Sequence, residues 1–147
     1  MLTIIMVFSL DSSLGFLMNR AANLMKGAIE ERLRKYGLTA PQWAVLARLT
    51  EEDGLNHSEI CARLFFDKPT ITGIVGRLEK KGLVKRLKGA KDRREVKVHL
   101  TGKGKNLMDE LPSFAEEVNR AASKGLDARE SAALKDALRK VISNLGS

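Results

Sequence analysis

Four basic side chains lie within seven consecutive residues, close enough together to bind one polyanion. They are Lys88, Lys91, Arg93 and Arg94. Lysine and arginine neutralise phosphate groups, and an arginine at the end of a narrow hairpin can enter the minor groove of a duplex. Asp92 stands among these cations, where its carboxylate would orient a neighbouring arginine through a charge-assisted hydrogen bond. The segment therefore predicts contacts with nucleic acid, with Asp92 as an orienting residue.

The excess positive charge of the chain is confined to the part of the sequence around this segment. The 147 residues include 26 Lys and Arg against 18 Asp and Glu, which gives a net charge of +8. Thirteen of the basic residues and only three of the acidic ones lie between Lys68 and Lys105. The remainder is slightly acidic, as expected of a protein that meets a polyanion on one face. A solvated charged surface without a partner is the alternative interpretation.

Length and composition limit the remaining classes of function. A chain of 147 residues is long enough for one domain with its own core, and 44% hydrophobic residues exclude a disordered chain. Cys61 is the single cysteine, which excludes an intramolecular disulfide and a multi-thiolate metal site. His57 lies four residues earlier and could form a thiol–imidazole pair with it. We instead expect Cys61 to be buried on the apolar side of its helix, with Ile60, Leu64 and Phe65.

Motifs for catalysis are missing from the sequence. It contains no nucleophile elbow, phosphate-binding loop or metal-binding motif. Carboxylate pairs such as Glu51 and Glu52 are adjacent in sequence and diverge on a helix, so they cannot serve as an acid–base pair. We therefore predict that the protein is not an enzyme and that it needs no cofactor and no metal.

The first ten residues, Met1 to Leu10, are nearly all apolar and carry no charged side chain. They are too few to cross a membrane, which requires about 20 apolar residues. The basic residues and the small residues of a secretory signal are also missing. We expect this segment to be buried against another helix or another subunit, in a cytoplasmic protein without membrane association.

Apolar residues recur at intervals of three and four through the first 80 residues, which predicts a series of amphipathic helices. Residues that commonly cap helices mark their starts. Thr39 begins a capping box, and Asn56 and Asp67 each precede a further apolar stripe. Glycines stand where the first and the fourth of these stripes end. The helices are expected over residues 14–36, 40–53, 57–65 and 68–81.

After Gly82 the apolar period changes from that of a helix to two, which predicts β-strands. Residues 83–87 form one candidate strand, and residues 95–100 alternate between apolar and polar side chains. The cationic segment joins them, so we expect a two-stranded hairpin with a charged tip. A helix capped by Thr101 and kinked at Pro112 follows, and a capping box at Asp127 starts the last helix.

Two short helices joined by a tight turn and followed by a hairpin predict a winged helix-turn-helix, in which the hairpin is the wing. The second helix of such a pair can enter the major groove of DNA. The apolar side of residues 68–81 must pack inward, which leaves polar and small residues facing outward. These are Lys68, Thr70, Thr72, Gly73, Gly76 and Arg77. The predicted fold is mostly α with a small β-hairpin wing.

Several motifs resemble the multiple-antibiotic-resistance regulator (MarR) family in their order and spacing. They are Leu38–Leu46, Ser58–Leu64, Asp67–Thr72, Arg77–Leu83 and Asp92–Thr101, within a match over about residues 14 to 145. The resemblance implies a dimeric transcriptional regulator, a winged helix-turn-helix plus an N- and C-terminal helical dimerisation domain. The dimerisation region would comprise residues 1–37 and 102–147, and the DNA-binding domain residues 38–101.

The resemblance also implies roles for individual residues. Asp92 and Arg94 match the wing pair, with Arg94 in the minor groove, and Lys68-Pro69 stands where many members have Arg-Ser. The implied effector is a small aromatic or phenolic compound, bound near Met25 and Trp43 between the two regions. The full set of predicted DNA-binding residues is Ser58, Lys68, Thr70, Thr72, Arg77, Lys88, Lys91, Arg93 and Arg94.

We predict a ligand-responsive repressor that binds a pseudo-palindromic operator in double-stranded DNA as a homodimer; the sequence itself does not distinguish repression from activation. The alternative is a winged-helix adaptor whose basic face meets an acidic protein partner, and which would lack salt-sensitive DNA binding. An RNA-binding protein is a third class. It is less favoured because single-stranded RNA commonly needs exposed aromatic platforms, and most of the seven aromatic residues lie in apolar stripes.

Overall fold

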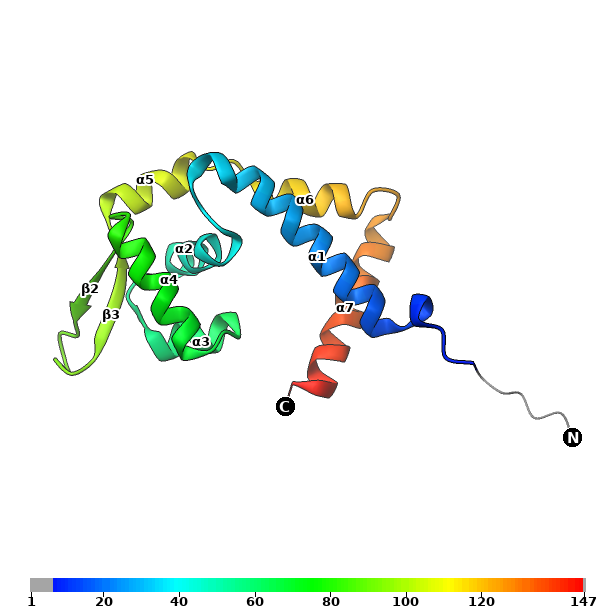
Figure 1. The fold of residues 1–147 in the computed structure, drawn as a ribbon, viewed down its shortest axis with the longest axis horizontal. Helices are drawn as coiled ribbons and strands as arrows, with labels where there is room; N and C mark the ends of the chain where they lie inside the picture. Colours follow the sequence, from blue (N-terminus) through cyan, green and yellow to red (C-terminus); the bar gives the residue numbers. More distant parts are fainter. Residues whose placement is uncertain (1–6, 147) are drawn as a thin grey trace, which may run out of the picture. The chain divides into compact units, whose positions relative to one another are not determined.

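The computed structural model describes residues 7–146, which divide into two compact units (Figure 1). The first unit ends at Pro112 and contains helices α1 to α5 and strands β1 to β3. The second unit begins at Ser113 and contains α6 (Phe114–Ala122) and α7 (Ala128–Leu145). Every element of the predicted winged helix-turn-helix therefore lies in the first unit.

Helix α1 (Leu14–Leu33) corresponds to the first predicted apolar stripe. A 3-10 turn over Leu10–Ser12 precedes it, and another over Arg34–Tyr36 continues it to Gly37. Gly37 has a φ of 68°, a left-handed conformation that lets the backbone leave the helix axis. The chain can thus turn at the predicted glycine, and Leu38 directly after it is buried in the core.

Helix α2 (Ala40–Glu51) begins with the predicted capping box. The Gln42 backbone N–H donates to Oγ1 of Thr39 at 3.3 Å, and the Thr39 N–H donates to Oε1 of Gln42 at 3.2 Å. These bonds satisfy amides that have no partner within the helix. The large aliphatic residues of α2 are fully buried: Val45, Leu46 and Leu49. This helix therefore lies at the centre of the first unit.

Helices α3 (His57–Leu64) and α4 (Lys68–Lys80) form the predicted helix pair and pack against each other (Figure 1). Asn56 caps α3 and Asp67 caps α4, each through a side-chain oxygen 2.8 Å from the backbone nitrogen three residues later. Both caps were predicted from the sequence. The buried stripe of α4 also matches the prediction and consists of Ile71, Ile74, Val75 and Leu78.

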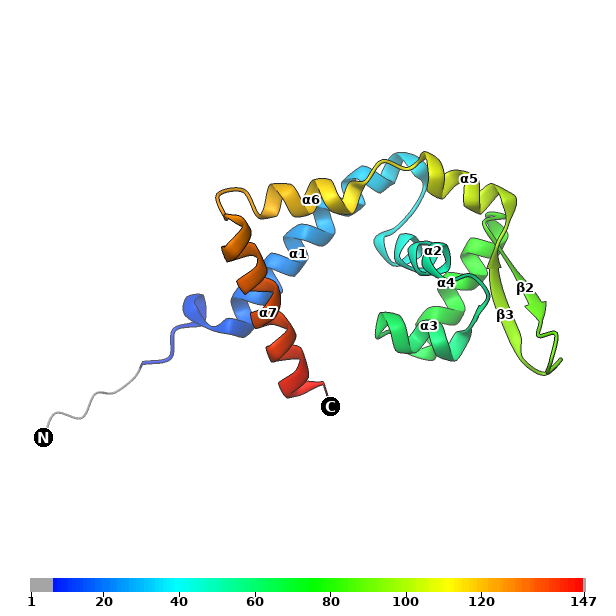
Figure 2. The ribbon, with the colours of Figure 1, turned by 180° about the vertical axis from the view of Figure 1, so that it is seen from behind.

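Three strands form an antiparallel sheet in the order β1–β3–β2, whereas the sequence predicts only a two-stranded hairpin. Strands β2 (Val84–Lys88) and β3 (Val96–Leu100) are the predicted pair, and they project beyond the helices in both views (Figures 1 and 2). Strand β1 (Leu55–Asn56) lies on the other side of β3, where Leu55 pairs with Val98. Sequence reasoning missed β1 because two residues are too few to show an alternating pattern.

Pro112 separates two helices, so the prediction of one helix kinked at this proline was wrong. Helix α5 (Gly102–Glu110) begins at the predicted cap, where Oγ1 of Thr101 accepts a hydrogen bond from the Gly104 N–H at 3.0 Å. Leu111 has an extended backbone with ψ of 127°, because the proline ring disfavours helical backbone at the residue before it. The chain therefore leaves the helix, and α6 starts two residues after the proline.

Phe65 and Cys61 are more exposed than the sequence predicts. The apolar pattern puts Phe65 on the buried side of α3, but this side chain is 89% exposed. Phe65 ends α3 in a left-handed conformation, with φ of 57°, and its N–H donates to the carbonyl of Cys61 at 2.9 Å. This conformation turns the chain toward α4 and takes the phenyl ring off the apolar stripe. Cys61 is a half-buried free thiol, while Ile60 beside it is fully buried.

Residues 1–6 of the apolar N-terminal segment lie outside the residues that the structure describes. Val7, Phe8 and Leu10 are exposed in the single chain, so burial of this segment against another subunit stays a prediction. Within residues 7–146, no helix is both long enough and apolar enough to cross a membrane.

We predict that Gly104 tolerates no side chain, because the first turn of α5 packs directly on the backbone before β2. A Cβ at this position would overlap the carbonyl oxygen of Leu83, which is itself held by a hydrogen bond from the Thr101 N–H at 3.0 Å. Gly104→Ala should therefore lower the free energy of unfolding by about 1–3 kcal/mol, as overpacked substitutions do. Urea denaturation followed by circular dichroism measures this change.

Gly102→Ala is the matched control in the same helix, because a Cβ there would meet nothing within 4 Å. This variant should keep the wild-type free energy of unfolding or raise it by up to about 1 kcal/mol, since alanine favours helix over glycine. Equal destabilisation by the two substitutions would contradict the close packing of α5 on Leu83.

Candidate nucleic-acid interface

Helix α4 presents a polar face to solvent because its opposite face belongs to the core. Its aliphatic side chains recur at intervals of three and four residues and are buried within the first unit. The side chains of α4 that the sequence predicts to face outward as DNA contacts are all exposed: they are Lys68, Thr70, Thr72 and Arg77. Hydroxyl and cationic groups on one helix face can bond to base edges and to phosphates.

Two glycines that the sequence predicts to face outward, Gly73 and Gly76, are partly covered. A Cβ at Gly73 would lie 3.5 Å from Nη1 of Arg77, and a Cβ at Gly76 would lie 3.8 Å from Nη2 of Arg86. Both guanidinium groups therefore lie across the helix, in the space beside the missing side chains. The middle of α4 presents charged groups here rather than bare backbone.

Asp67 holds the first turn of α4, from which Lys68 and Thr70 project. Its Oδ1 accepts a hydrogen bond from the Thr70 N–H at 2.8 Å. Hydrogen bonds from the side chain and the backbone of Thr70 hold the pKa of Asp67 below its ordinary value, because they stabilise the ionised carboxylate. The charged form of Asp67 is therefore the form that fixes the start of this helix.

Asn56 joins the first turn of α3 to Glu95, the residue directly before β3. Its Oδ1 caps α3 through the Glu59 N–H, and its Nδ2 donates to Oε1 of Glu95 at 2.8 Å. Both ends of one amide are thus used, which fixes α3 and the start of β3 relative to each other. Ser58 lies exposed in this first turn, as expected of a predicted contact residue.

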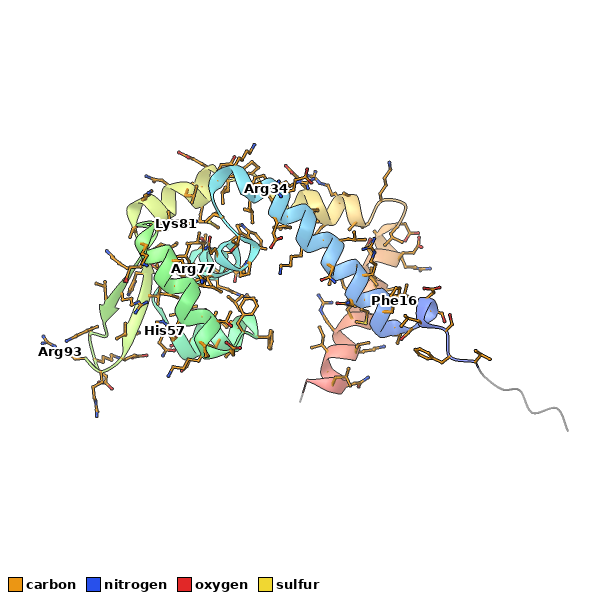
Figure 3. All side chains as sticks on the ribbon, viewed as in Figure 1. Phe16, Arg34, His57, Arg77, Lys81 and Arg93 are labelled. Carbon is orange, nitrogen blue, oxygen red and sulfur yellow. The ribbon has the colours of Figure 1, made fainter. Side chains whose placement is uncertain are left out.

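The tip of the wing is held by its own backbone and by Asp92. The Gly89 N–H donates to the carbonyl of Glu95 at 2.7 Å, which closes the hairpin. Oδ1 of Asp92 accepts bonds from the backbone N–H of Arg94 at 3.0 Å and from its Nε at 3.5 Å. The Arg94 side chain is nevertheless 94% exposed, so this contact orients it without covering it. The other predicted cations are exposed too, with Arg93 at the far end of the hairpin (Figure 3): Lys88, Lys91 and Arg93.

His57 and Arg86 belong to the same surface, and sequence reasoning did not identify them. Arg86 lies on β2 with its Nε 3.7 Å from Oε2 of Glu79 on α4. Burial, and after it the positive charges of Arg86 and Lys68, lower the pKa of His57, so that the imidazole is neutral at neutral pH. The charges of Arg86 on β2 and Lys68 on α4 thus act on His57, which Figure 3 shows at the start of α3. Alternation along β2 could have indicated Arg86, because it shares a sheet face with the buried Val84.

Two arginines outside the basic stretch, Arg48 and Arg63, are paired with carboxylates. Arg63 bonds to Glu52, which lowers the pKa of Glu52 through the hydrogen bond and the charge of the guanidinium. Arg48 lies 2.9 Å from a carboxylate oxygen of Glu51. The positive charge of these residues is therefore neutralised locally, whereas that of the wing tip is not matched by an equal number of acidic side chains.

A cavity of about 640 Å³ lies between α1, α2 and the outward face of α4. Met25 and Trp43, the predicted effector residues, are half-buried and each adjoins a lining residue in sequence, but neither lines this cavity. Two of the predicted DNA contacts do line it. The charged and amide-bearing residues of its wall are Lys26, Glu30, Gln42 and Arg77, and Thr70 adds a hydroxyl.

The part of the chain that the structure describes contains no group of three His, Cys, Asp or Glu side chains that could hold a metal ion. His57 and Cys61, which the sequence offers as a pair, lie on α3 with Cys61 as a free thiol.

The helix pair α3–α4 and the hairpin that follows it define the fold class as a winged helix-turn-helix, mostly helical with a small antiparallel sheet. Residues 38–96 match the model of the MarR family. The chain belongs to this family, as the resemblance of its motifs implies. The matched range contains the exposed face of α4 and the tip of the wing.

Relatives and solved structures agree with this assignment. The HTH-type transcriptional regulator TtmR of Methylorubrum extorquens is 39% identical over 121 residues, which span 82% of this chain but only 62% of TtmR. The structure of Bordetella bronchiseptica BpsR, whose DNA binding is regulated by 6-hydroxynicotinic acid, matches with a TM-score of 0.85 and 27% identity over 92% of this chain and 96% of BpsR. Staphylococcus aureus MepR in complex with DNA matches with a TM-score of 0.84 and 26% identity over 93% and 99% of the two chains.

The lowered pKa of Asp67 predicts a pH-dependent contribution of this cap to stability. A carboxyl whose pKa is depressed on folding stabilises the fold above its unfolded pKa, and this contribution is lost as pH falls through the folded pKa. Asp67→Asn keeps a capping oxygen that does not titrate. The free energy of unfolding should therefore be higher for wild type than for this variant at neutral pH. The difference should shrink as the pH falls below 3.8, the ordinary pKa of an aspartate. Urea midpoints between about pH 3 and 7 measure it, and a difference independent of pH would contradict the role of the charge.

Proposed function

We propose that the protein is a sequence-specific, double-stranded DNA-binding transcriptional regulator that acts in the cytoplasm as a homodimer on a pseudo-palindromic operator. The observation that carries this proposal is the exposed polar face of α4 beside a wing with four exposed cations at its tip. Helix α4 would enter the major groove, which is about 12 Å wide and admits one helix. The wing would bring Arg94 to an adjacent minor groove.

A homodimer is part of the proposal because one copy of this surface would contact only half of such an operator. Two copies would present their α4 helices to half-sites about 34 Å apart, one helical turn of DNA. An exposed apolar stripe on α7 supports pairing between copies, since large apolar patches on a chain usually mark an interface. This stripe consists of Leu134, Leu138, Ile142 and Leu145. The proposed dimerisation region comprises residues 1–37 and 102–147.

We further infer that a small effector controls DNA binding, as expected of a ligand-responsive repressor. BpsR, whose DNA binding is regulated by 6-hydroxynicotinic acid, supports this inference. The 640 Å³ cavity has the size of a small-molecule site and is lined by Thr70 and Arg77, two of the proposed DNA contacts. A small aromatic or phenolic compound bound there would compete with DNA for these side chains. That Met25 and Trp43 contact the effector remains a prediction from the sequence.

We predict that Arg94→Ala weakens binding to an operator selected from random duplexes by about 1–3 kcal/mol, because a groove contact is lost. Lys91→Ala is the comparison variant on the same hairpin. If Lys91 neutralises a phosphate, its loss weakens binding to all DNA sequences alike. It also reduces the slope of log affinity against log salt concentration by about one. Fluorescence anisotropy with operator and random duplexes, each over a range of salt concentrations, measures both effects.

Two outcomes of this experiment would change the proposal. Unaltered operator affinity and an unaltered footprint in Arg94→Ala would remove the wing from the interface. Failure of the wild-type protein to bind any duplex in a salt-sensitive manner would favour the adaptor, in which the basic face meets an acidic protein partner.

We predict that Ile142→Glu weakens the homodimer, because it introduces a charge into the exposed apolar stripe of α7. Ile142 is 63% exposed in the single chain, so the substitution should leave the fold of one copy intact. Ser143→Glu is the matched control, since it adds the same charge at the next exposed position. Sedimentation equilibrium should show dissociation for the first variant alone, and a dimer unaffected by Ile142→Glu would exclude this stripe from the interface.

A further inference from the structure

Lys81, directly after α4, directs its side chain toward the start of α2. Its ammonium group donates hydrogen bonds to the carbonyl of Gly37 and to Oε1 of Gln42, the latter at 3.3 Å. Figure 3 shows Lys81 at the end of α4 away from α3. By composition it is one more cation of the basic stretch, but its polar contacts are with the protein itself.

The two acceptors of Lys81 are fixed parts of the fold. Gln42 is a buried residue, 6% exposed, and its Oε1 also accepts the bond from the Thr39 N–H that closes the capping box of α2. Gly37 ends the 3-10 turn after α1 in a left-handed conformation. Lys81 therefore bonds to the junction between α1 and α2, at a point that the local backbone geometry already determines.

A second lysine holds the same end of α4 from another direction. Nζ of Lys103, in the first turn of α5, donates to the backbone carbonyl of Lys81 at 2.9 Å. Carbonyls at the C-terminal end of a helix lack partners within the helix and carry partial negative charge, so an ammonium group is favourable there. The end of α4 is thus connected to α2 through one lysine and to α5 through another.

We propose that Lys81 is a positioning residue that sets the angle of α4 and does not bind phosphate, so that it governs sequence discrimination rather than charge-dependent affinity. This inference rests on the proposed DNA-binding function. The 13 residues of α4 span about 18 Å at about 1.5 Å per residue. A tilt of about 5° at one end would move the other end by about 1.5 Å. Donor–acceptor distances in hydrogen bonds vary over a range of only about 0.5 Å, so this displacement would break contacts with the bases. The residues expected at the bases lie at that other end.

The test compares Lys81→Met with Lys81→Arg and with Lys80→Met, in the full-length chain. Arginine keeps a donor for the Gly37 and Gln42 oxygens, and Lys80→Met removes the same charge from the adjacent exposed residue. Affinity for the selected operator and for a random duplex is measured over a range of salt concentrations. Lys81→Met should lower the ratio of operator to random affinity about three- to tenfold, as weakened base contacts would, with the salt slope unchanged. Lys81→Arg should restore most of the ratio, and Lys80→Met should leave it as in wild type.

A reading of Lys81 as a phosphate contact gives a different result. Operator and random duplex would then weaken alike, the salt slope would fall by about 0.9, and the proposal would be overturned. Lys80→Met changing the ratio as much as Lys81→Met would overturn it too, since the effect would then follow from charge alone.

Amide hydrogen exchange in the free protein tests the positioning contact without DNA. The N–H of Gly82 bonds to the carbonyl of Glu79 and that of Leu83 to the carbonyl of Leu78, at the end of α4 that Lys81 holds. Lys81→Met should speed exchange at these two amides about two- to fivefold, as expected for loss of a solvent-accessible, charge-assisted contact, while Lys80→Met should not. Unchanged exchange would overturn the proposal, whatever the DNA measurements give. If Lys81→Met exchanges faster but the wild-type protein binds no duplex, the contact of Lys81 with the α1–α2 junction would be established, and the proposed DNA-binding function would be refuted.

Discussion

The burial of one aliphatic stripe determines which face of α4 can meet a partner. Ile71, Ile74, Val75 and Leu78 are buried, and each such side chain contributes about 1.5–3 kcal/mol relative to exposure. Rotating the helix would expose several of them, at a cost comparable to the whole stability of a domain of about 5–15 kcal/mol. The outward direction of Lys68, Thr70 and Arg77 is therefore set by the core and not by whatever binds there.

Polar contacts refine an orientation that the core has already selected. Asp67 holds one end of α4, Lys81 and Lys103 hold the other, and Asn56 links α3 to Glu95, directly before β3. Each hydrogen bond of this kind contributes only about 0.5–1.5 kcal/mol, which is small beside the buried stripe. Their importance lies in geometry, because they join elements that would otherwise move independently at the scale of a single hydrogen bond.

The basic stretch contains two kinds of cation that a charge count does not separate. Lys81, Lys103 and Arg86 have acceptors within the protein, on the α1–α2 junction, on the end of α4 and on Glu79. The wing tip instead projects its cations into solvent, and even Arg94, which Asp92 contacts, stays exposed. Net charge predicts the side of the molecule that would attract a polyanion, but it overstates the number of groups available to such a partner.

The sequence by itself determined the features that depend on neighbouring residues. The caps at Thr39, Asn56 and Asp67, the buried stripe of α4 and the pairing of β2 with β3 all follow from local patterns, because helices and hairpins are stabilised by contacts between residues close in the chain. The sequence also placed the predicted polar side chains on the exposed face of α4 and the predicted cations at an exposed tip.

Only the tertiary structure decided how distant segments meet. Strand β1 exists because β3, some 40 residues later, offers it a partner, and the Lys81 side chain bonds to the α1–α2 junction because Gly37, 44 residues earlier, presents a carbonyl to it. The exposure of Phe65 likewise follows from the direction in which α4 must leave α3. Such contacts leave no periodic signal in the sequence, since they depend on the packing of whole elements and not on the spacing of adjacent side chains.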